Sequence, residues 1–308
     1  MPETKAATAP TATASGSELL SQFPGFELLR EKGRGPHATV FKARRLSDKL
    51  VVALKIYHAG ACDRATVARL NEGIKATAKL QHPGAVRALE FKTEAGRSAL
   101  VLEYATGEAL SNFLYRQQKL PASKAIAVML HGVRTLASVA PQGFHHGRLY
   151  PGAVILSRNN VRITGVGMGE RPQHAPWSVQ YPDLFDPLMY TAPEAMPSKP
   201  FPTTNLEAVD IYSLGAMLFH LLTGQAPQEG NDEGSILAER KRYRTPLERF
   251  PALLSPELRG VLANMLAADP GERPWHASGA RESACRAGSA CPAYAAGCRA
   301  GRGRGARR

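Results

Sequence analysis

The sequence predicts an α+β fold of two lobes, a small β-rich lobe with one helix followed by a larger α-helical lobe. Three observations carry this prediction. Between residues 26 and 104, short runs rich in β-branched and aromatic residues alternate with turn signals. From Ile126 onward, apolar residues recur at helical spacing. Residues 211–222 are apolar on nearly every side, which is typical of a helix at the centre of a helical lobe.

Composition limits the class of protein. The chain has 308 residues and 44% hydrophobic content, enough to bury a core. No run reaches the roughly eighteen apolar residues of a membrane span, and the start lacks the apolar core of a signal peptide. We therefore expect no membrane span and a cytoplasmic location. The net charge of +13 would suit an acidic partner, but residues 278–308 supply much of it, so we do not favour nucleic acid.

Composition also sets the expected boundaries. Residues 1–24 have almost no large apolar side chains, which predicts a disordered leader. A folded domain follows over residues 25–277, with lobes over 25–105 and 106–277. Residues 278–308 form an Arg/Gly/Ala/Cys tail whose bias is also that of an off-frame reading of GC-rich DNA. Three of the four cysteines lie in this tail, at spacings that match neither a zinc site nor a disulfide framework, so we expect no metal.

The small lobe should contain five strands near residues 26–33, 38–46, 50–57, 85–91 and 98–104. One helix should interrupt them from Asp63, a good N-cap, to Leu80. Val67, Leu70 and Ile74 would form its inner face. Residues 154–164 predict a further strand pair in the large lobe.

Four motifs stand in order along these elements. They are Gly33-Arg34-Gly35-Pro36-His37-Ala38-Thr39-Val40, Val52-Ala53-Leu54-Lys55, Leu102-Glu103-Tyr104-Ala105 and Ala192-Pro193-Glu194. Together they resemble the eukaryotic-type serine/threonine protein kinase family from about Phe26 to Trp275. The resemblance implies a two-lobed protein-kinase-like fold.

The resemblance also implies a nucleotide site between the lobes. Lys55 would contact phosphate and pair with Glu72, and residues 102–105 would supply the hinge. The Lys55–Glu72 pair could equally be a structural salt bridge, and core packing accounts for the apolar members somewhat better than ligand contact does. The expected nucleotide-binding residues are Gly33, Gly35, Val40, Ala53, Lys55, Glu72, Leu102, Glu103, Ala105 and Ile155.

A second set of matches concerns the scaffold of the large lobe. In the family, the residues that match Glu194 and Arg273 form an ion pair, and the residue that matches Asp210 anchors the central helix. His146 matches the first residue of the catalytic loop. These residues predict the fold and carry no chemistry.

The catalytic positions depart from the family pattern. Arg148 stands where the family has the acid that accepts the substrate proton, and an arginine cannot act as a base. Tyr150 replaces a lysine, and Ala153 and Gly165 replace the two magnesium ligands. Pro187 replaces a threonine that contacts the acid and the lysine in the family.

These losses predict a pseudokinase, a protein kinase-like domain without phosphotransferase activity that acts as a scaffold or allosteric regulator in signalling. The resemblance leaves room for weak ATP binding without magnesium. We expect the partner to be another protein, such as an active kinase. Two alternatives stay open: a divergent ATP-dependent kinase or nucleotide transferase that uses other residues, and nucleic-acid association through the basic tail.

Overall fold

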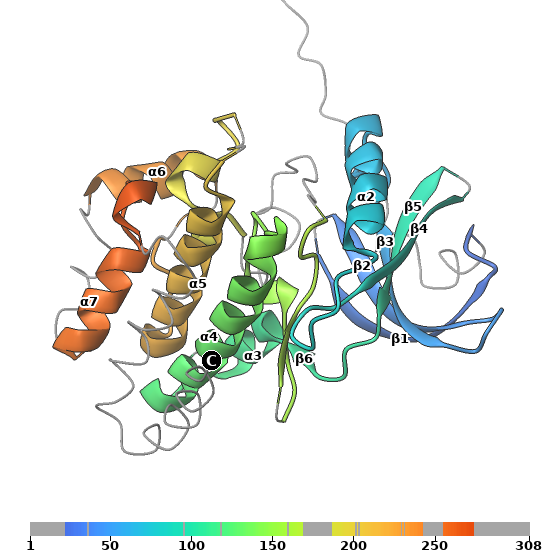
Figure 1. Ribbon diagram of the computed structural model, residues 1–308, viewed down its shortest axis with the longest axis horizontal. Coiled ribbons are helices and arrows are strands. Elements are labelled where there is room, and N and C mark those ends of the chain that lie inside the picture. Colours follow the sequence, from blue (N-terminus) through green and yellow to red (C-terminus); the bar gives the residue numbers. More distant parts are fainter. Residues whose placement is uncertain are drawn as a thin grey trace, which may run out of the picture.

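The computed structural model describes residues 22–273, apart from 36, 95, 118, 159, 169–186, 201, 203, 229, 231 and 243–254. Figure 1 shows a sheet with helix α2 beside it on the right and the remaining labelled helices on the left. The α+β fold of two lobes is therefore observed. Most of the expected leader and the expected tail lie outside the described residues.

Five antiparallel strands form the sheet of the small lobe, in the order β1-β2-β3-β5-β4. The strands are β1 (Phe26–Arg34), β2 (Ala38–Arg45), β3 (Val51–Tyr57), β4 (Ala88–Glu94) and β5 (Arg97–Glu103). Alternation in β3 buries Val52, Leu54 and Ile56 on one face. Phe23 and Phe26 pack against this face. Phe23 was expected in the leader, but at 1% exposure it belongs to the folded core.

Helix α2 (Arg64–Thr77) crosses the other face of the sheet. It begins where the sequence predicts, because the Asp63 side chain accepts a hydrogen bond from the Thr66 amide at 2.7 Å. It ends at Thr77, three residues before the predicted end at Leu80. Its buried residues differ in part from the predicted ones and are Thr66, Leu70, Gly73 and Thr77.

The large lobe is mainly helical, with a small sheet of order β6-β7-β8 at its edge. These strands are β6 (Glu108–Ala109), β7 (Val154–Leu156) and β8 (Val161–Ile163). The helices are α3 (Leu110–Gln117), α4 (Ala122–Val139), α5 (Leu206–Thr223), α6 (Glu233–Arg242) and α7 (Pro256–Met265). Short 3₁₀ helices are η1 (Ala140–Gln142), η2 (Pro151–Ala153), η3 (Pro187–Tyr190), η4 (Pro193–Ala195) and η6 (Pro270–Glu272). Helix α4 packs against both α5 and β8.

Helix α5 is the central helix of this lobe. Every residue from Val209 to Leu221 is buried, as the uniformly apolar sequence predicts. By length and composition alone, Leu206–Thr223 could also cross a membrane, but 72% of it is buried inside the domain, the pattern of a core helix. Gly224 caps the end of the helix: its φ of 82° is left-handed, and its amide donates to the His220 carbonyl.

Backbone hydrogen bonds hold the two lobes together, in addition to the covalent connection along the chain. The loop after α2 runs beside β8: the Ile163 amide donates to the Gly84 carbonyl at 2.7 Å, and the Val86 amide donates to the Ile163 carbonyl at 2.8 Å. Gly84 also lies so close to Thr135 of α4 that a side chain at position 84 would collide with it. The small lobe is therefore held against the large one at this loop.

Candidate functional site

The glycine-rich segment forms the turn between β1 and β2. Gly33 pairs with Val40 across the two strands, next to a bulge in the register. The amide of Gly35 donates to the Ala38 carbonyl at 2.8 Å, which closes the turn. A Cβ on Gly33 would meet nothing within 4 Å, so this glycine leaves open space beside the backbone.

Strand β3 carries the next two expected residues. Lys55 lies opposite Val40 on one neighbouring strand and opposite Leu100 on the other. Its ammonium group lies 5.2 Å from the centre of the Tyr57 ring, within cation–π distance. Ala53 lies opposite Leu102, and both belong to the apolar cluster between the sheet and α2. The register therefore brings together the side chains that the resemblance placed around a nucleotide.

The structure does not contain the expected Lys55–Glu72 ion pair. Glu72 is exposed on α2 and makes no ion pair with Lys55. Gly73, one residue further on, occupies the inner face instead. A Cβ on Gly73 would lie 2.9 Å from both the Cα and the carbonyl oxygen of Met168, so α2 packs directly against that segment of the large lobe.

The hinge after β5 has two notable features. Ala105 is half-buried, and among the described residues it takes part in no backbone hydrogen bond. The amide of Glu103 donates to the Arg87 carbonyl at 2.9 Å, and its carboxylate forms a bidentate pair with Arg162 of β8, both N–O distances being 3.0 Å. This pair lowers the pKa of Glu103. Arg162 also donates to the Ala85 carbonyl at 3.0 Å, so one guanidinium links the hinge, β8 and the loop after α2.

The backbone of the catalytic-loop segment is held by one buried carboxylate. The two oxygens of Asp210 accept hydrogen bonds from the amides of His146 and Gly147 at 2.8 and 2.7 Å. Burial raises the pKa of Asp210 to about 7. Gly147 has a φ of 74°, a left-handed conformation that glycine adopts without strain. The backbone around the expected active position is therefore firmly fixed.

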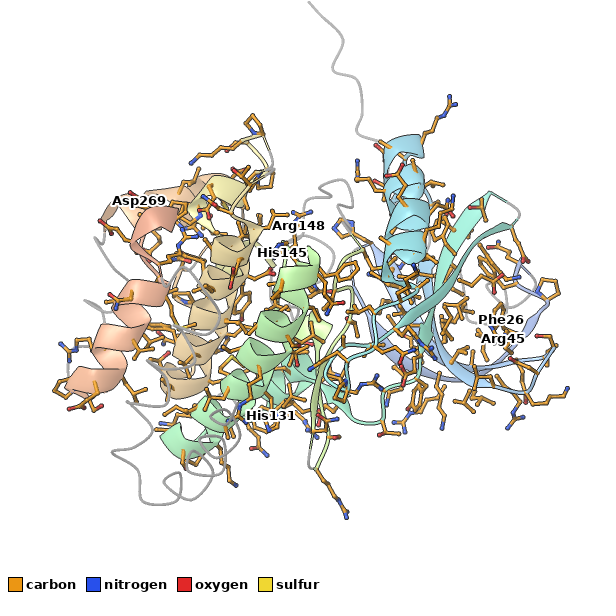
Figure 2. The ribbon with its side chains drawn as sticks, in the orientation of Figure 1. Phe26, Arg45, His131, His145, Arg148 and Asp269 are labelled. Carbon is orange, nitrogen blue, oxygen red and sulfur yellow. The ribbon has the colours of Figure 1, made fainter. Side chains whose placement is uncertain are left out.

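The side chains on this frame carry no carboxylate. Arg148 is half-buried, and its amide donates to Nδ1 of His146 at 3.2 Å. The Tyr150 ring covers Gly152, where a side chain would collide with it. Ala153 is 4% exposed within the apolar core of the large lobe. Figure 2 shows Arg148 and His145 between the helices of the large lobe and α2.

Residues 165–168 form a tight turn after β8. Gly165 and Gly167 have φ values of 79° and 72°. The Gly167 amide donates to the His145 carbonyl at 2.8 Å. Val166 and Met168 are buried at 3% and 1% exposure. The turn therefore packs by backbone and apolar contact, and a Cβ on Gly167 would come within 2.6 Å of Thr77 on α2.

The other two scaffold residues, Glu194 and Arg273, form an ion pair in the large lobe. Arg273 donates to the carboxylate of Glu194 at 2.6 and 2.9 Å, and the Arg273 side chain is 0% exposed. Its guanidinium carbon lies 5.0 Å from the centre of the Tyr212 ring. The 3₁₀ helix η3 begins at Pro187, whose side chain lies outside the described part of the structure.

Comparison with known proteins identifies this arrangement. A family model described as the protein kinase domain matches residues 26–283. Human serine/threonine-protein kinase ULK3 is 28% identical over 254 residues, which are 81% of this chain and 52% of ULK3. Mouse Aurora kinase C is 27% identical over 255 residues, which are 80% of this chain and 87% of that protein.

A solved structure supports the fold alone. The crystal structure of Rad53 residues 1–466 in complex with AMP-PNP has a TM-score of 0.65 and 22% identity, and the match covers 85% of this chain and 65% of that one. The chain spans about half the length of the ULK3 relatives that it matches. Because the family model covers most of the chain and the two lobes agree with it, the chain belongs to the protein kinase domain family, among relatives that are serine/threonine kinases.

Proposed function

We propose that this chain is a pseudokinase, a protein kinase domain that transfers no phosphate and acts as a scaffold or allosteric partner of another protein. One observation carries the proposal. Asp210 holds the amides of His146 and Gly147 at 2.8 and 2.7 Å, so the loop backbone is fixed, yet the next side chain on it is the arginine Arg148. The loop backbone is held in place, but the side chain that would act as the general base is absent.

The chemistry of the side chains explains why transfer should fail. The guanidinium of Arg148 stays protonated at every accessible pH and cannot accept the proton of a substrate hydroxyl. Losing a general base costs about 10²–10⁴ in rate. Ala153 offers a methyl group and Gly165 a hydrogen atom, so the residues at the two metal positions do not fit a magnesium ion. No group of three His, Cys, Asp or Glu elsewhere in the described residues could hold one.

The adenine half of the site fits a ligand better than the phosphate half does. Val40 and Ile155 come from opposite lobes and are only half-buried, so each keeps apolar surface that a base could cover. Ala105 keeps an N–H and a carbonyl for an adenine edge. The Rad53 structure holds AMP-PNP, and we infer that ATP can bind this chain too, weakly and without magnesium. Lys55 would then be the main cation for its phosphates.

The proposed role requires a protein partner. The domain is folded into two lobes, but its site lacks the reacting groups, so it would act by binding another protein through its surface. The partner we favour is another protein, such as an active kinase whose conformation this domain biases. Purification of the native chain with its bound proteins would identify it.

The decisive experiment is a phosphotransfer assay on the full chain. Radiolabelled ATP should give no stoichiometric labelling of the chain, of casein or of a basic protein, with either Mg²⁺ or Mn²⁺. Lys55→Ala is the site variant, and Lys92→Ala is the control, because Lys92 is a half-buried lysine on β4 that pairs with Glu90 and Glu94. Labelling that Lys55→Ala abolishes and Lys92→Ala leaves intact would overturn the proposal and establish a divergent kinase or nucleotide transferase.

A further inference from the structure

The middle of the chain has an unusual charge distribution. Between Ala109 and Gly169 the sequence has seven Lys and Arg residues and no Asp or Glu. All 26 acidic residues of the chain lie outside this stretch. The stretch builds α3, α4, the catalytic-loop segment and strands β7 and β8. The charged side chains that these elements contribute are therefore all of a single sign.

Some of these cations are already neutralised within the chain. Arg116 pairs with Glu108 at 2.7 Å, and Arg162 pairs with Glu103 at 3.0 Å. Lys124 and Arg134 differ: both are exposed, and neither forms an ion pair with any residue that the structure describes. Within the described part of the chain, no carboxylate neutralises their charges.

Helix α4 places these charges on one side. Its buried residues, including Ile126, Met129, Leu130 and Val133, face the core. Lys124, His131 and Arg134 are exposed on the other side, and we call them the α4 basic face. At 1.5 Å per residue, the ends of this face are about 15 Å apart along the helix. Figure 2 shows His131 well away from Arg148 and His145, so this face is separate from the catalytic-loop segment.

We propose that the α4 basic face is a docking surface for an acidic segment of another protein. The inference adds a location to the proposed scaffold role, but it holds whether or not the chain transfers phosphate. Without carboxylates on α4, nothing on the helix competes with an incoming carboxylate or repels it.

The spacing of the charges favours a protein over nucleic acid or membrane. A nucleic acid presents about one charge per 1.7 Å and is bound by dense cations and stacking aromatic rings. The α4 basic face has two permanently charged cations, Lys124 and Arg134, and its one ring is the His131 imidazole, because α4 contains no Phe, Tyr or Trp. Membrane attachment by charge needs a cluster of about 4–8 Lys or Arg residues. A protein segment with a few spaced Asp or Glu residues matches the face better.

The test compares two double variants of the full chain that change net charge equally. Lys124→Glu/Arg134→Glu reverses the α4 basic face, and Arg64→Glu/Lys75→Glu reverses two exposed cations on α2. The probe is a fluorescein-labelled peptide of alternating glutamate and serine, measured by anisotropy at low salt. A single-stranded poly(A) RNA of equal charge is the second probe. The basic tail is present in every variant, so its contribution cancels in the comparison.

We expect the α4 variant to weaken peptide binding about tenfold and the α2 variant to weaken it by less than about twofold. Added salt should weaken binding to the unaltered chain. Equal weakening by both variants would show an effect of net charge and overturn the proposal, as would absence of peptide binding. If the α4 variant weakens RNA binding more than it weakens peptide binding, the proposal is overturned in favour of a nucleic-acid site. If the Glu variant unfolds, Lys124→Gln/Arg134→Gln gives the same comparison with a smaller expected effect.

Discussion

The ion pair of Glu194 and Arg273 in the large lobe gives the sharpest prediction for stability. Arg273 donates five hydrogen bonds from a side chain that is 0% exposed. Two reach the carboxylate of Glu194. The others reach the backbone carbonyls of Ala208, Ala267 and Ala268. Arg273→Ala would leave all these acceptors without their donor and open a cavity beside them.

Breaking a buried pair from one side costs about 3–5 kcal/mol. For a domain of this size, each kcal/mol lowers the melting temperature by about 2–4 °C, so Arg273→Ala should lower it by about 6–20 °C. Glu194→Ala should cost less, about 1–3 kcal/mol, because Glu194 is 22% exposed and Arg273 would keep its carbonyl acceptors and gain access to water.

The matched control is the exposed pair of Arg116 and Glu108. Its N–O distance is 2.7 Å, like that of the buried pair, but the two side chains are 59% and 36% exposed. Arg116→Ala should therefore change stability by only about 0–1 kcal/mol. Thermal unfolding followed by circular dichroism at fixed pH and salt measures all the variants. If Arg273→Ala melts at the same temperature as Arg116→Ala, burial does not strengthen the pair and the reasoning fails.

Three further predictions follow from other contacts. Gly73→Ala should destabilise the protein, because the new Cβ would lie 2.9 Å from Met168. The control is Gly260→Ala in α7, whose Cβ meets nothing within 4 Å and which should stabilise by about 0.5–1 kcal/mol. Equal effects of the two variants in thermal melts would contradict the close packing of α2. Because burial raises the pKa of Asp210 to about 7, the folded protein binds that proton more tightly than the unfolded chain, so the free energy of unfolding should fall as the pH rises from about 4 to about 7. Urea titrations across that range should show that Asp210→Asn removes this part of the slope; an unchanged slope would rule out Asp210 as its source. ATP and adenosine should raise the melting temperature equally in magnesium and in EDTA, and Lys55→Ala should reduce the ATP shift alone; a shift that requires magnesium would reveal a metal site.

Much of the fold was predictable because its signals are local. Asp63 predicts a helix start by a hydrogen bond to an amide three residues away, and the structure has that bond. The apolar run at 211–222 predicts a buried helix without knowledge of its neighbours, and α5 is that helix. Helix α3 was not predicted, since its eight residues are too short for a clear period.

The inner face of α2 was predicted less well. Successive residues on a helix are separated by about 100°, so an error of one position turns a side chain from the core to the solvent. The structure buries Thr66, Gly73 and Thr77, which are small or polar and give little hydrophobic signal. Glu72 was expected to face Lys55 only because the family resemblance pairs the two positions. Only the close approach of Met168 to Gly73 shows which side of the helix faces inward, and this contact joins distant parts of the chain.

The link between Glu103 and Arg162 could not be predicted for the same reason. The two residues are 59 positions apart, and each alone resembles an ordinary surface charge. The folded chain brings β8, the end of β5 and the loop after α2 together. This places the Arg162 guanidinium 3.0 Å from both the Glu103 carboxylate and the Ala85 carbonyl. The sequence predicts which side chains are missing from the site more readily than which ones meet there.

The fixed backbone of the catalytic loop does not by itself argue for catalysis. Asp210 is buried at a cost in desolvation, but replacing it with an apolar residue would leave two amides, those of His146 and Gly147, without acceptors. Folding alone therefore accounts for Asp210, just as it accounts for the pair of Glu194 and Arg273. The positions that inform about function are those where folding tolerates many residue types but catalysis requires one particular group. Arg148 is such a position, because the family resemblance leads us to expect a base there. The phosphotransfer assay, rather than any measurement of folding, therefore tests the proposed function.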